Sequence, residues 1–196
     1  MISAKRVAWG LLAAAAVGVA LGVFKGNETG LRGGIGNLSA PWLLIAMIPA
    51  LRCRTLSQGA AVGLLSTLIA LLGFYAALTV VLAGHLGGGG FSAELAVEAE
   101  ANRIYFVAGL LTGPILGAAG AWIGRHHPQS VWPIVGALLT SEIAVVALVQ
   151  GHQLAPAPLY FEWGVDDWTP YIGEAVLGVG IIVAAMWHRH RLASDV

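Results

Sequence analysis

Long apolar stretches, separated only by short polar connections, leave this chain few ways to fold. A helix that crosses a bilayer needs about 20 apolar residues, and stretches of about this length recur along the chain. Charged residues make up only 10% of the sequence, whereas a soluble domain carries about 25%. Ten acids and ten bases cannot cover a water-exposed surface. We therefore predict an all-α integral membrane protein with a single domain over residues 1–196.

One apolar stretch is too short to span the membrane alone. Pro41–Leu51 reaches spanning length only with the preceding Leu31–Ala40, which is rich in glycine. The positive-inside rule favours counting it, because a scheme without it places Arg52 and Arg54 on the same side as Lys25. With it, most bases fall on the cytoplasmic side and most acids outside. We predict a bundle of six transmembrane helices with cytoplasmic N- and C-termini, and spans at about 7–24, 37–51, 59–86, 104–123, 131–150 and 171–187.

Glycines form a continuous stripe along the fourth predicted span. At about 100° per residue they fall within one arc of the helix; they are Gly109, Gly113, Gly117, Gly120 and Gly124. Small residues let helix backbones approach closely in lipid, where no hydrophobic force drives helices together. The stripe predicts a tight contact, either within the chain or at an interface with a second copy or a membrane partner subunit.

Glu142 is the acidic residue that the sequence places deepest in the membrane. It follows Val131 by about 16 Å of helix, at about 1.5 Å per residue. Placing an acid at this depth costs about 2.5–3.5 kcal/mol, so it should face the protein interior. Thr140 and Ser141 precede it and add hydroxyl groups. One interpretation is a site for a cation, a proton or a polar solute group; the other is a neutral glutamic acid that only joins helices.

Two further features are candidates for the same site. Glu174 lies one turn inside the last predicted span, where it either lines the mouth of a cavity or simply benefits from the helix dipole. The stretch 31–41 contains Asn37, Ser39 and Pro41 and predicts a break in the second span. Broken helices form binding sites in many transporters, although this stretch is also compatible with an ordinary outer loop. The ligand-binding candidates are Glu142, Glu174, Asn37 and Ser141.

Several function classes lack support in the sequence. The formal net charge is +0, so we expect no nucleic-acid partner. No nucleotide-binding or nucleophile motif is present, and the single cysteine, Cys53, excludes an internal disulfide. No histidine falls at mid-span, so we expect neither a cofactor nor a metal. An enzyme is the less favoured class; it would be an intramembrane enzyme that acts on a lipid-linked substrate through Glu142 and Glu174.

Two motifs support a family resemblance. Gly36-Asn37-Leu38-Ser39-Ala40-Pro41-Trp42-Leu43-Leu44 opens the second span, and Tyr105-Phe106-Val107-Ala108-Gly109-Leu110-Leu111-Thr112-Gly113-Pro114-Ile115-Leu116-Gly117 opens the fourth. Together with Glu142 they resemble a family of small actinobacterial multi-span membrane proteins of unknown function. The length and the number of spans also resemble the substrate-binding subunits of energy-coupling-factor importers. These resemblances imply a multi-span membrane protein and supply no activity.

The sequence thus favours an inner-membrane protein of bacteria that binds or transports a small solute or ion. Its site would lie between the broken second span and Glu142, open to the outside. The alternative is a non-catalytic structural or accessory subunit that assembles through its glycine-striped helices. In both cases we expect the lipid bilayer to be the main partner.

Overall fold

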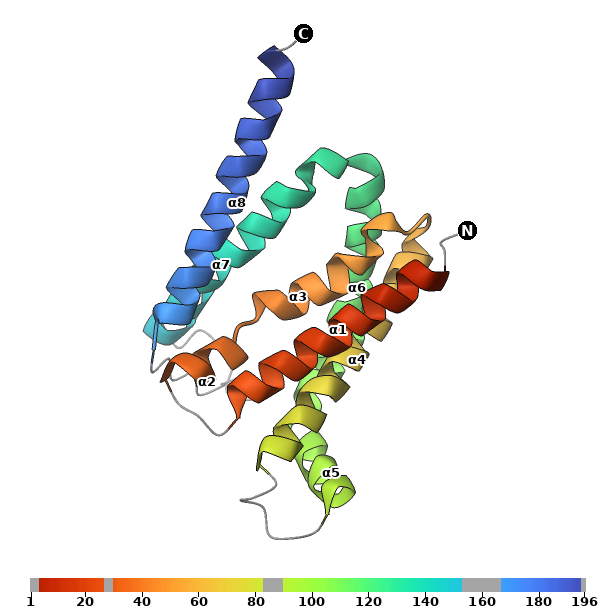
Figure 1. Ribbon diagram of the computed structural model, residues 1–196, viewed down its shortest axis with the longest axis vertical. Helices are drawn as coiled ribbons and strands as arrows, with labels where there is room; N and C mark the ends of the chain where they lie inside the picture. The colour runs from red at the N-terminus through yellow and green to blue at the C-terminus, as the bar shows by residue number, and fades with distance from the viewer. Residues whose placement is uncertain (1–3, 27–29, 83–89, 153–166, 195–196) are drawn as a thin grey trace.

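The computed structural model describes residues 4–26, 30–82, 90–152 and 167–194, and every regular element in these ranges is a helix (Figure 1). Six segments are long and apolar enough to cross a membrane; they are Val7–Lys25, Gly30–Arg52, Leu56–Leu82, Arg103–His126, Pro128–Leu148 and Thr169–Arg191. The prediction of an all-α, six-helix membrane protein is therefore confirmed. The described part of the third span ends at Leu82, and its predicted continuation to residue 86 lies outside the described residues.

The helices follow one another with short connections. In chain order they are α1 (Ala4–Lys25), α2 (Gly30–Gly36), α3 (Ala40–Met47), the 3-10 helix η1 (Pro49–Arg52), α4 (Leu56–Leu82), α5 (Phe91–Ala101), α6 (Arg103–His126), η2 (Pro128–Ser130), α7 (Val131–His152) and α8 (Thr169–Ser194). The second span is thus built from α2, α3 and η1. It begins at Gly30, earlier than the expected start at residue 37, because α2 adds two helical turns before the break.

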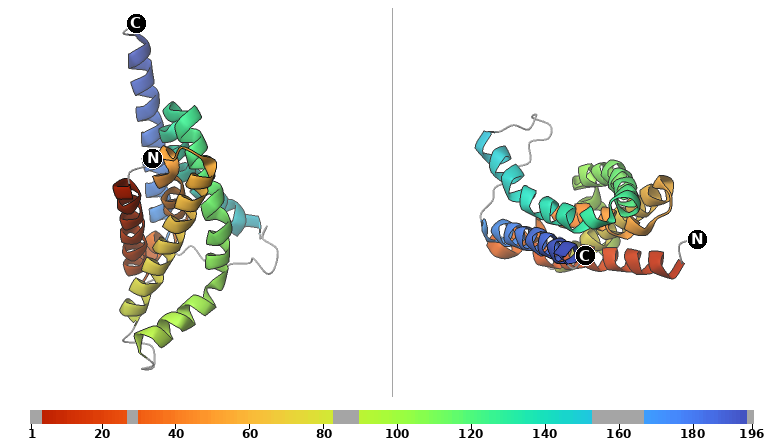
Figure 2. Two further views of the ribbon diagram at one scale, coloured as in Figure 1. Left: turned by 90° about the vertical axis from the view of Figure 1, so that its right-hand side faces the viewer. Right: turned by 90° about the horizontal axis from the view of Figure 1, so that it is seen from above.

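α4 packs between α1 and α6 by direct backbone contact (Figures 1 and 2). A Cβ atom at Gly63 or Gly117 would collide with backbone atoms of the facing helix, and a Cβ at Gly18 of α1 would collide with the backbone of Ala70. In lipid, such close approach replaces hydrophobic burial as the force that holds helices together. These three helices therefore form one tightly packed layer.

The glycine stripe of α6 lies inside the chain over its whole length. Gly109 and Gly113 lie against Thr67 of α4, and Gly117 lies against α4 as well. Further along, Gly120 approaches the carbonyl of Met47, and Gly124 approaches that of Leu51 in the second span. This face of α6 is therefore occupied by α4, α3 and η1.

The second span connects this layer to a second one, formed by α7 and α8. α7 and α8 meet through Gly136 and Gly178, whose added Cβ atoms would each meet the carbonyl oxygen of the other glycine. α3 contacts α4, α6 and α7, while α2 contacts α1 and α8. In Figure 1 the α7–α8 pair lies on one side of α3, and α1 and α4 lie on the other.

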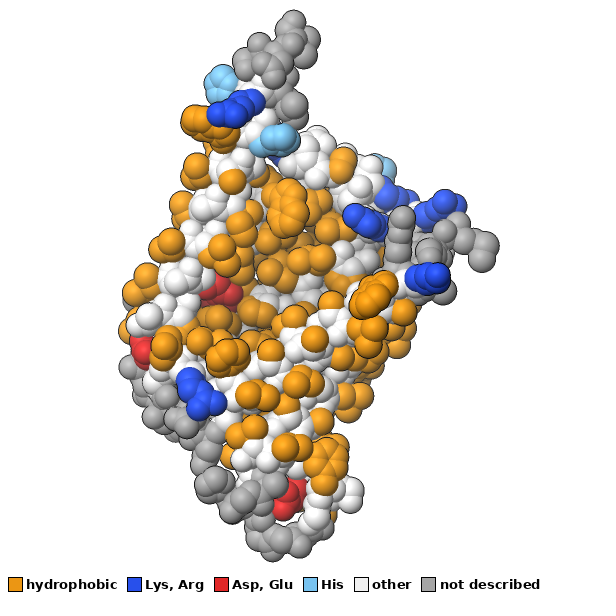
Figure 3. All heavy atoms as spheres, viewed as in Figure 1, with side chains coloured by type: hydrophobic (Ala, Val, Ile, Leu, Met, Phe, Trp, Pro, Cys, Tyr) orange, Lys and Arg blue, Asp and Glu red, His pale blue; other side chains and the backbone are white. Residues whose placement is uncertain are grey.

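Most of the basic side chains visible in Figure 3 lie toward the end of the molecule where α8 ends. Arg125 Nη1 donates a hydrogen bond to the carbonyl oxygen of Arg54 (2.8 Å), and Arg189 donates to that of Gln129. These bonds join the α6–α7 connection to the η1–α4 connection and to the end of α8. α5, which carries three glutamates, lies toward the opposite end.

Candidate functional site

The second span, Gly30–Arg52, is interrupted within its length between α2 and α3. α2 ends at Gly36, α3 begins at Ala40, and Ser39 is the N-cap of α3 without a side-chain capping bond. The backbone N–H of Asn37 closes α2 on the carbonyls of the preceding turn. At the start of α3, however, the first N–H groups have no preceding turn to bond, and Pro41 has no N–H. Two backbone donors, those of Ser39 and Ala40, therefore need acceptors from elsewhere.

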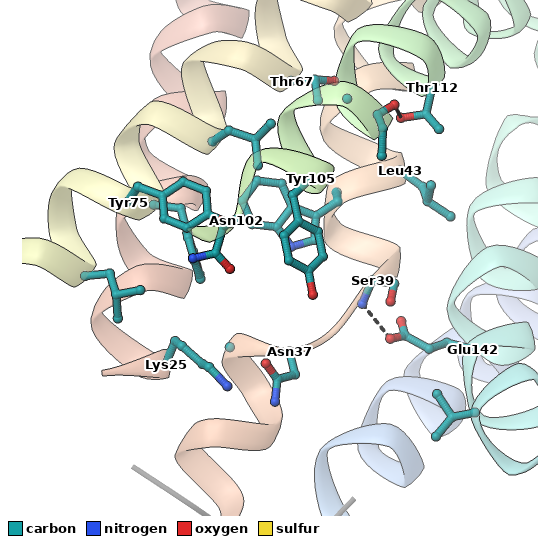
Figure 4. A pocket seen from close by; sticks show the side chains of 18 of the residues that line it. Lys25, Asn37, Ser39, Leu43, Thr67, Tyr75, Asn102, Tyr105, Thr112 and Glu142 are labelled. Carbon is teal, nitrogen blue, oxygen red and sulfur yellow. Dashed lines mark hydrogen bonds between the residues drawn. The ribbon is translucent and has the colours of Figure 1, made fainter. Parts of the chain in front are cut away.

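Glu142 of α7 supplies both acceptors. Its Oε1 accepts a hydrogen bond from the backbone N–H of Ser39 (2.5 Å; Figure 4), and its Oε2 accepts one from that of Ala40 (2.7 Å). The side chain is only 6% exposed. A carboxylate is also favoured at a helix N-terminus, where the peptide dipoles leave partial positive charge. The helix break and the deep acid, two separate features of the sequence, thus form one contact between α3 and α7.

A cavity of about 500 Å³ adjoins this contact. It lies among α3, α4, α6 and α7, and the ends of α1 and α2, the α5–α6 junction and the start of α8 are also on its wall. Its polar lining is Lys25, Asn37, Ser39, Thr67, Tyr75, Asn102, Tyr105, Thr112, Glu142 and Tyr171, and its apolar and glycine lining is Gly36, Trp42, Leu43, Leu71, Phe74, Leu78, Ala108, Gly109 and Val146. A pocket of this size, in which polar groups converge on a cavity that also has apolar and aromatic walls, is compatible with a small-molecule site.

The polar groups lie at different sides of the cavity. The Lys25 side chain and the Asn37 amide lie together on one side, across the cavity from Thr67 and Thr112 (Figure 4). The hydroxyls of Thr67 and Thr112 donate to carbonyl oxygens of their own helices, both at 2.9 Å. Their oxygens therefore remain able to accept hydrogen bonds from a ligand, while Lys25 offers donors and a positive charge.

Aromatic rings stiffen the wall of the cavity. Trp42 meets Phe74 edge to face at 5.4 Å between centroids, and Phe74 meets Tyr75 in the same manner at 5.1 Å. Tyr75 in turn stacks on Phe106 at 5.2 Å. This run of rings joins α3, α4 and α6, so the part of the wall that it forms is fixed by packing rather than by a ligand.

The other predicted site residues divide into two groups. Glu174 is buried (7% exposed) on α8 and interacts with Glu142, and Tyr171 lies near both carboxyl groups. Ser141, in contrast, is exposed, and its hydroxyl donates to the carbonyl of Leu138 on the same helix (2.9 Å). The structure therefore places Asn37 and Glu142 on the wall of the cavity, Glu174 next to Glu142 but outside this lining, and Ser141 outside the cavity.

Several lining residues were not singled out from the sequence. Lys25 ends the first span, and Asn102 and Tyr105 open the fourth, so each resembled an ordinary residue of the membrane boundary. The Asn102 amide is held by the backbone carbonyl oxygen of Glu98 (2.9 Å), and Tyr105 is 43% exposed at the rim. The sequence does contain a signal for these residues: all three are polar, and they lie at span ends predicted to share one side of the membrane.

Titratable groups outside the spans do not belong to this site. Asp167 accepts a hydrogen bond from the N–H of Thr169 (2.8 Å) at the start of α8, and this contact holds the pKa of its carboxyl below the ordinary value. Burial raises the pKa of the Cys53 thiol, so this cysteine is a weak nucleophile. Among the residues that the structure describes, no three His, Cys, Asp or Glu side chains form a metal-binding group.

Comparisons with protein-family models, with curated proteins and with solved structures find no match for this chain. They identify no family or homologue, so the two resemblances noted in the sequence stay hypotheses. The class that the structure defines is a multi-span membrane protein with six apolar helices.

Proposed function

We propose that this protein binds a small polar solute in the cavity beside Glu142. The observation that carries the proposal is the junction of the broken second span with a buried carboxylate on the wall of a cavity of about 500 Å³. Lys25 and Asn37 would hold an anionic or carbonyl group of the solute, and the threonine and tyrosine hydroxyls would hold its other polar atoms. The aromatic wall favours a solute with an apolar or aromatic body.

Transport of the solute belongs to the same proposal. Discontinuous helices whose half-helix ends face a cavity are the usual site of substrate binding in secondary transporters. Here α3 is a short half-helix held to α7 by the Glu142 hydrogen bonds, so a change in these bonds would alter the cavity wall. We further propose a bacterial inner-membrane location with both termini in the cytoplasm, on the basis of the basic end of the molecule.

Two other functions receive less support. An accessory subunit that assembles through glycine stripes would need those stripes on a free surface, whereas the α6 stripe lies against α4 and the second span. An enzyme with two acidic residues would need both carboxyls at the substrate. Glu142 and Glu174 do lie together, but Glu174 is absent from the cavity lining.

The proposal is tested by solute-dependent stability of the purified protein in lipid nanodiscs. A panel of amino acids, short organic acids, aromatic acids and inorganic ions is screened for a rise in unfolding temperature. A solute at 100 times its dissociation constant stabilises the protein by about 2.7 kcal/mol, which is readily detected. We expect at least one compound of the panel to stabilise the wild-type protein.

The variants Asn37→Ala and Thr112→Val then locate the binding. Both residues line the cavity, so both variants should weaken the solute-dependent shift. Ser141→Ala is the matched control, since Ser141 is adjacent to Glu142 in sequence but lies outside the cavity. The proposal fails if no compound stabilises the protein, or if the shift is the same in the lining variants and in the control.

A further inference from the structure

The buried carboxyl of Glu174 has no role in the solute site described above. It is 7% exposed on α8, and its Oε2 atom is fully buried without a hydrogen-bond partner among the described residues. Its neighbour on the facing helix α7 is the carboxyl of Glu142. A buried polar atom of this kind is costly unless a partner is supplied. The missing partner must therefore be explained.

The hydrogen bonds around the two carboxyl groups favour a negative charge on Glu142 rather than on Glu174. Both of its oxygens accept N–H bonds, from Ser39 and from Ala40, at the start of a half-helix. A carboxylate accepts hydrogen bonds on both oxygens, and the helix N-terminus favours its negative charge. A second negative charge beside it, within the membrane, would meet like-charge repulsion in a medium that screens weakly.

No positive group among the described residues compensates a charge on Glu174. On its own helix its neighbour is the phenol of Tyr171, and on α7 it is Glu142. α2, which also packs on α8, carries Arg32, whose Nη2 donates to the carbonyl oxygen of Val23 (3.4 Å). Lys25 lies on the wall of the cavity that Glu142 lines and Glu174 does not.

We propose that Glu174 is a proton-binding site, and that the Glu142–Glu174 pair holds one exchangeable proton within the membrane. In the resting state of this proposal the proton is on Glu174, which is therefore neutral beside the Glu142 carboxylate. Transfer breaks the O–H bond of Glu174 and forms one on Glu142, so the pair keeps one proton and one negative charge. A protonated Glu142 can no longer accept two N–H bonds equally well, so this transfer loosens α3 from α7.

Glu142 also connects the pair to the cavity. It lines the cavity whereas Glu174 does not, so a proton from cavity water reaches Glu174 through Glu142. The inference does not depend on the identity of a solute, or on whether one binds. It assigns the pair a coupling role: occupancy by a proton determines how firmly the half-helix is held.

Infrared spectroscopy of the full chain in lipid nanodiscs tests the proposal. A protonated carboxylic acid has a carbonyl band separate from the carboxylate bands, and the band shifts in D2O. We expect this band in the wild-type protein at neutral pH, where a glutamate with the ordinary pKa of its side chain is ionised and contributes no such band. Its absence from the wild-type spectrum would overturn the proposal without any variant, and without bearing on solute binding.

Two matched variants assign the band. Glu174→Gln should abolish the band. Glu142→Gln should retain it, at the same or at a shifted frequency. Glu98→Gln on α5 is the control for a glutamate outside the pair and should leave the band unchanged. A band that persists in Glu174→Gln, or that is lost only in Glu142→Gln, refutes the assignment. Should Glu174→Gln not fold, Glu174→Asp replaces it, and the expected result is a shifted band.

Discussion

Glu142 does for one half-helix what a preceding helical turn does inside a continuous helix. The N–H groups of Ser39 and Ala40 would otherwise be unbonded at membrane depth, where water cannot replace the missing acceptors. The same contact makes the acid tolerable. Its insertion cost of about 2.5–3.5 kcal/mol is offset by two charge-assisted hydrogen bonds and the dipole of α3.

Replacing Glu142 should therefore destabilise the protein. Glu142→Gln keeps one oxygen acceptor but turns an NH2 group toward the second backbone donor, and Glu142→Ala removes both acceptors. A buried unsatisfied donor costs about 1–3 kcal/mol, so we expect a loss of about that size for Gln and a larger one for Ala. The free energy of unfolding, measured in detergent micelles by denaturant titration, gives both values.

Ser141→Ala provides the matched comparison for these variants. Its hydroxyl is exposed and bonds only within α7, so the free energy of unfolding should change by less than about 0.5 kcal/mol. Equal losses in Ser141→Ala and Glu142→Ala would show that the α3 contact contributes nothing specific.

The site could be predicted only as separate residues. Glu142 and the Asn37 region stood out because polar groups at membrane depth are costly. Their contact joins residues about 100 positions apart, and no local pattern selects that partner. Ser141 was grouped with Glu142 by adjacency, but neighbours on a helix point about 100° apart, and Ser141 faces outward. Lys25 was missed because a base at the end of a span also fits an ordinary membrane boundary.

The helices illustrate a similar division between what spacing predicts and what it leaves open. Glycine spacing identified the contact face of α6, since that face depends only on the period of the helix. It left two partners open, and the described structure places α4 and the second span there. The break before α3 was one of two interpretations of this stretch, and the other was an ordinary outer loop. The helical turns of α2 were not, because a short glycine-rich sequence has low intrinsic helix propensity.

Alanine at the closest glycine contact should therefore destabilise the fold. In Gly63→Ala or Gly117→Ala the new methyl group would collide with the backbone of the facing helix, which cannot rotate away as a side chain can. Overpacking of this kind costs about 1–3 kcal/mol. Gly180→Ala on α8 is the control, because a Cβ there meets nothing within 4 Å. It should be neutral or stabilising by up to about 1 kcal/mol.

Thermal unfolding of the three alanine variants in one detergent measures these differences. Equal unfolding temperatures for Gly63→Ala and Gly180→Ala would contradict a close backbone contact between α4 and α6. A change of oligomeric state in Gly117→Ala without a loss of stability would instead support an interface between copies.

The position of the cavity follows from how the two groups of helices are joined. α1, α4 and α6 form one layer, α7 and α8 form another, and the second span contacts both. Because α3 is a half-helix, its open N-terminus lies between the layers rather than at the membrane surface. The site thus needs both layers, which explains why no single span of the sequence contains it.

The end-to-end separation of charge makes a prediction about orientation. One end of the molecule contains Arg54, Arg125 and Arg189, and the side chains of Arg125 and Arg189 donate hydrogen bonds to backbone carbonyl oxygens there. By the positive-inside rule this end should face the cytoplasm, and α5 should face outward. In a bacterial host, green fluorescent protein fused after Val196 should fluoresce, whereas alkaline phosphatase fused there should be inactive. Alkaline phosphatase fused after Gly90, ahead of α5, should be active. The reverse pattern would place α5 and the Lys25 side of the cavity in the cytoplasm, and the proposed access from outside would then be wrong.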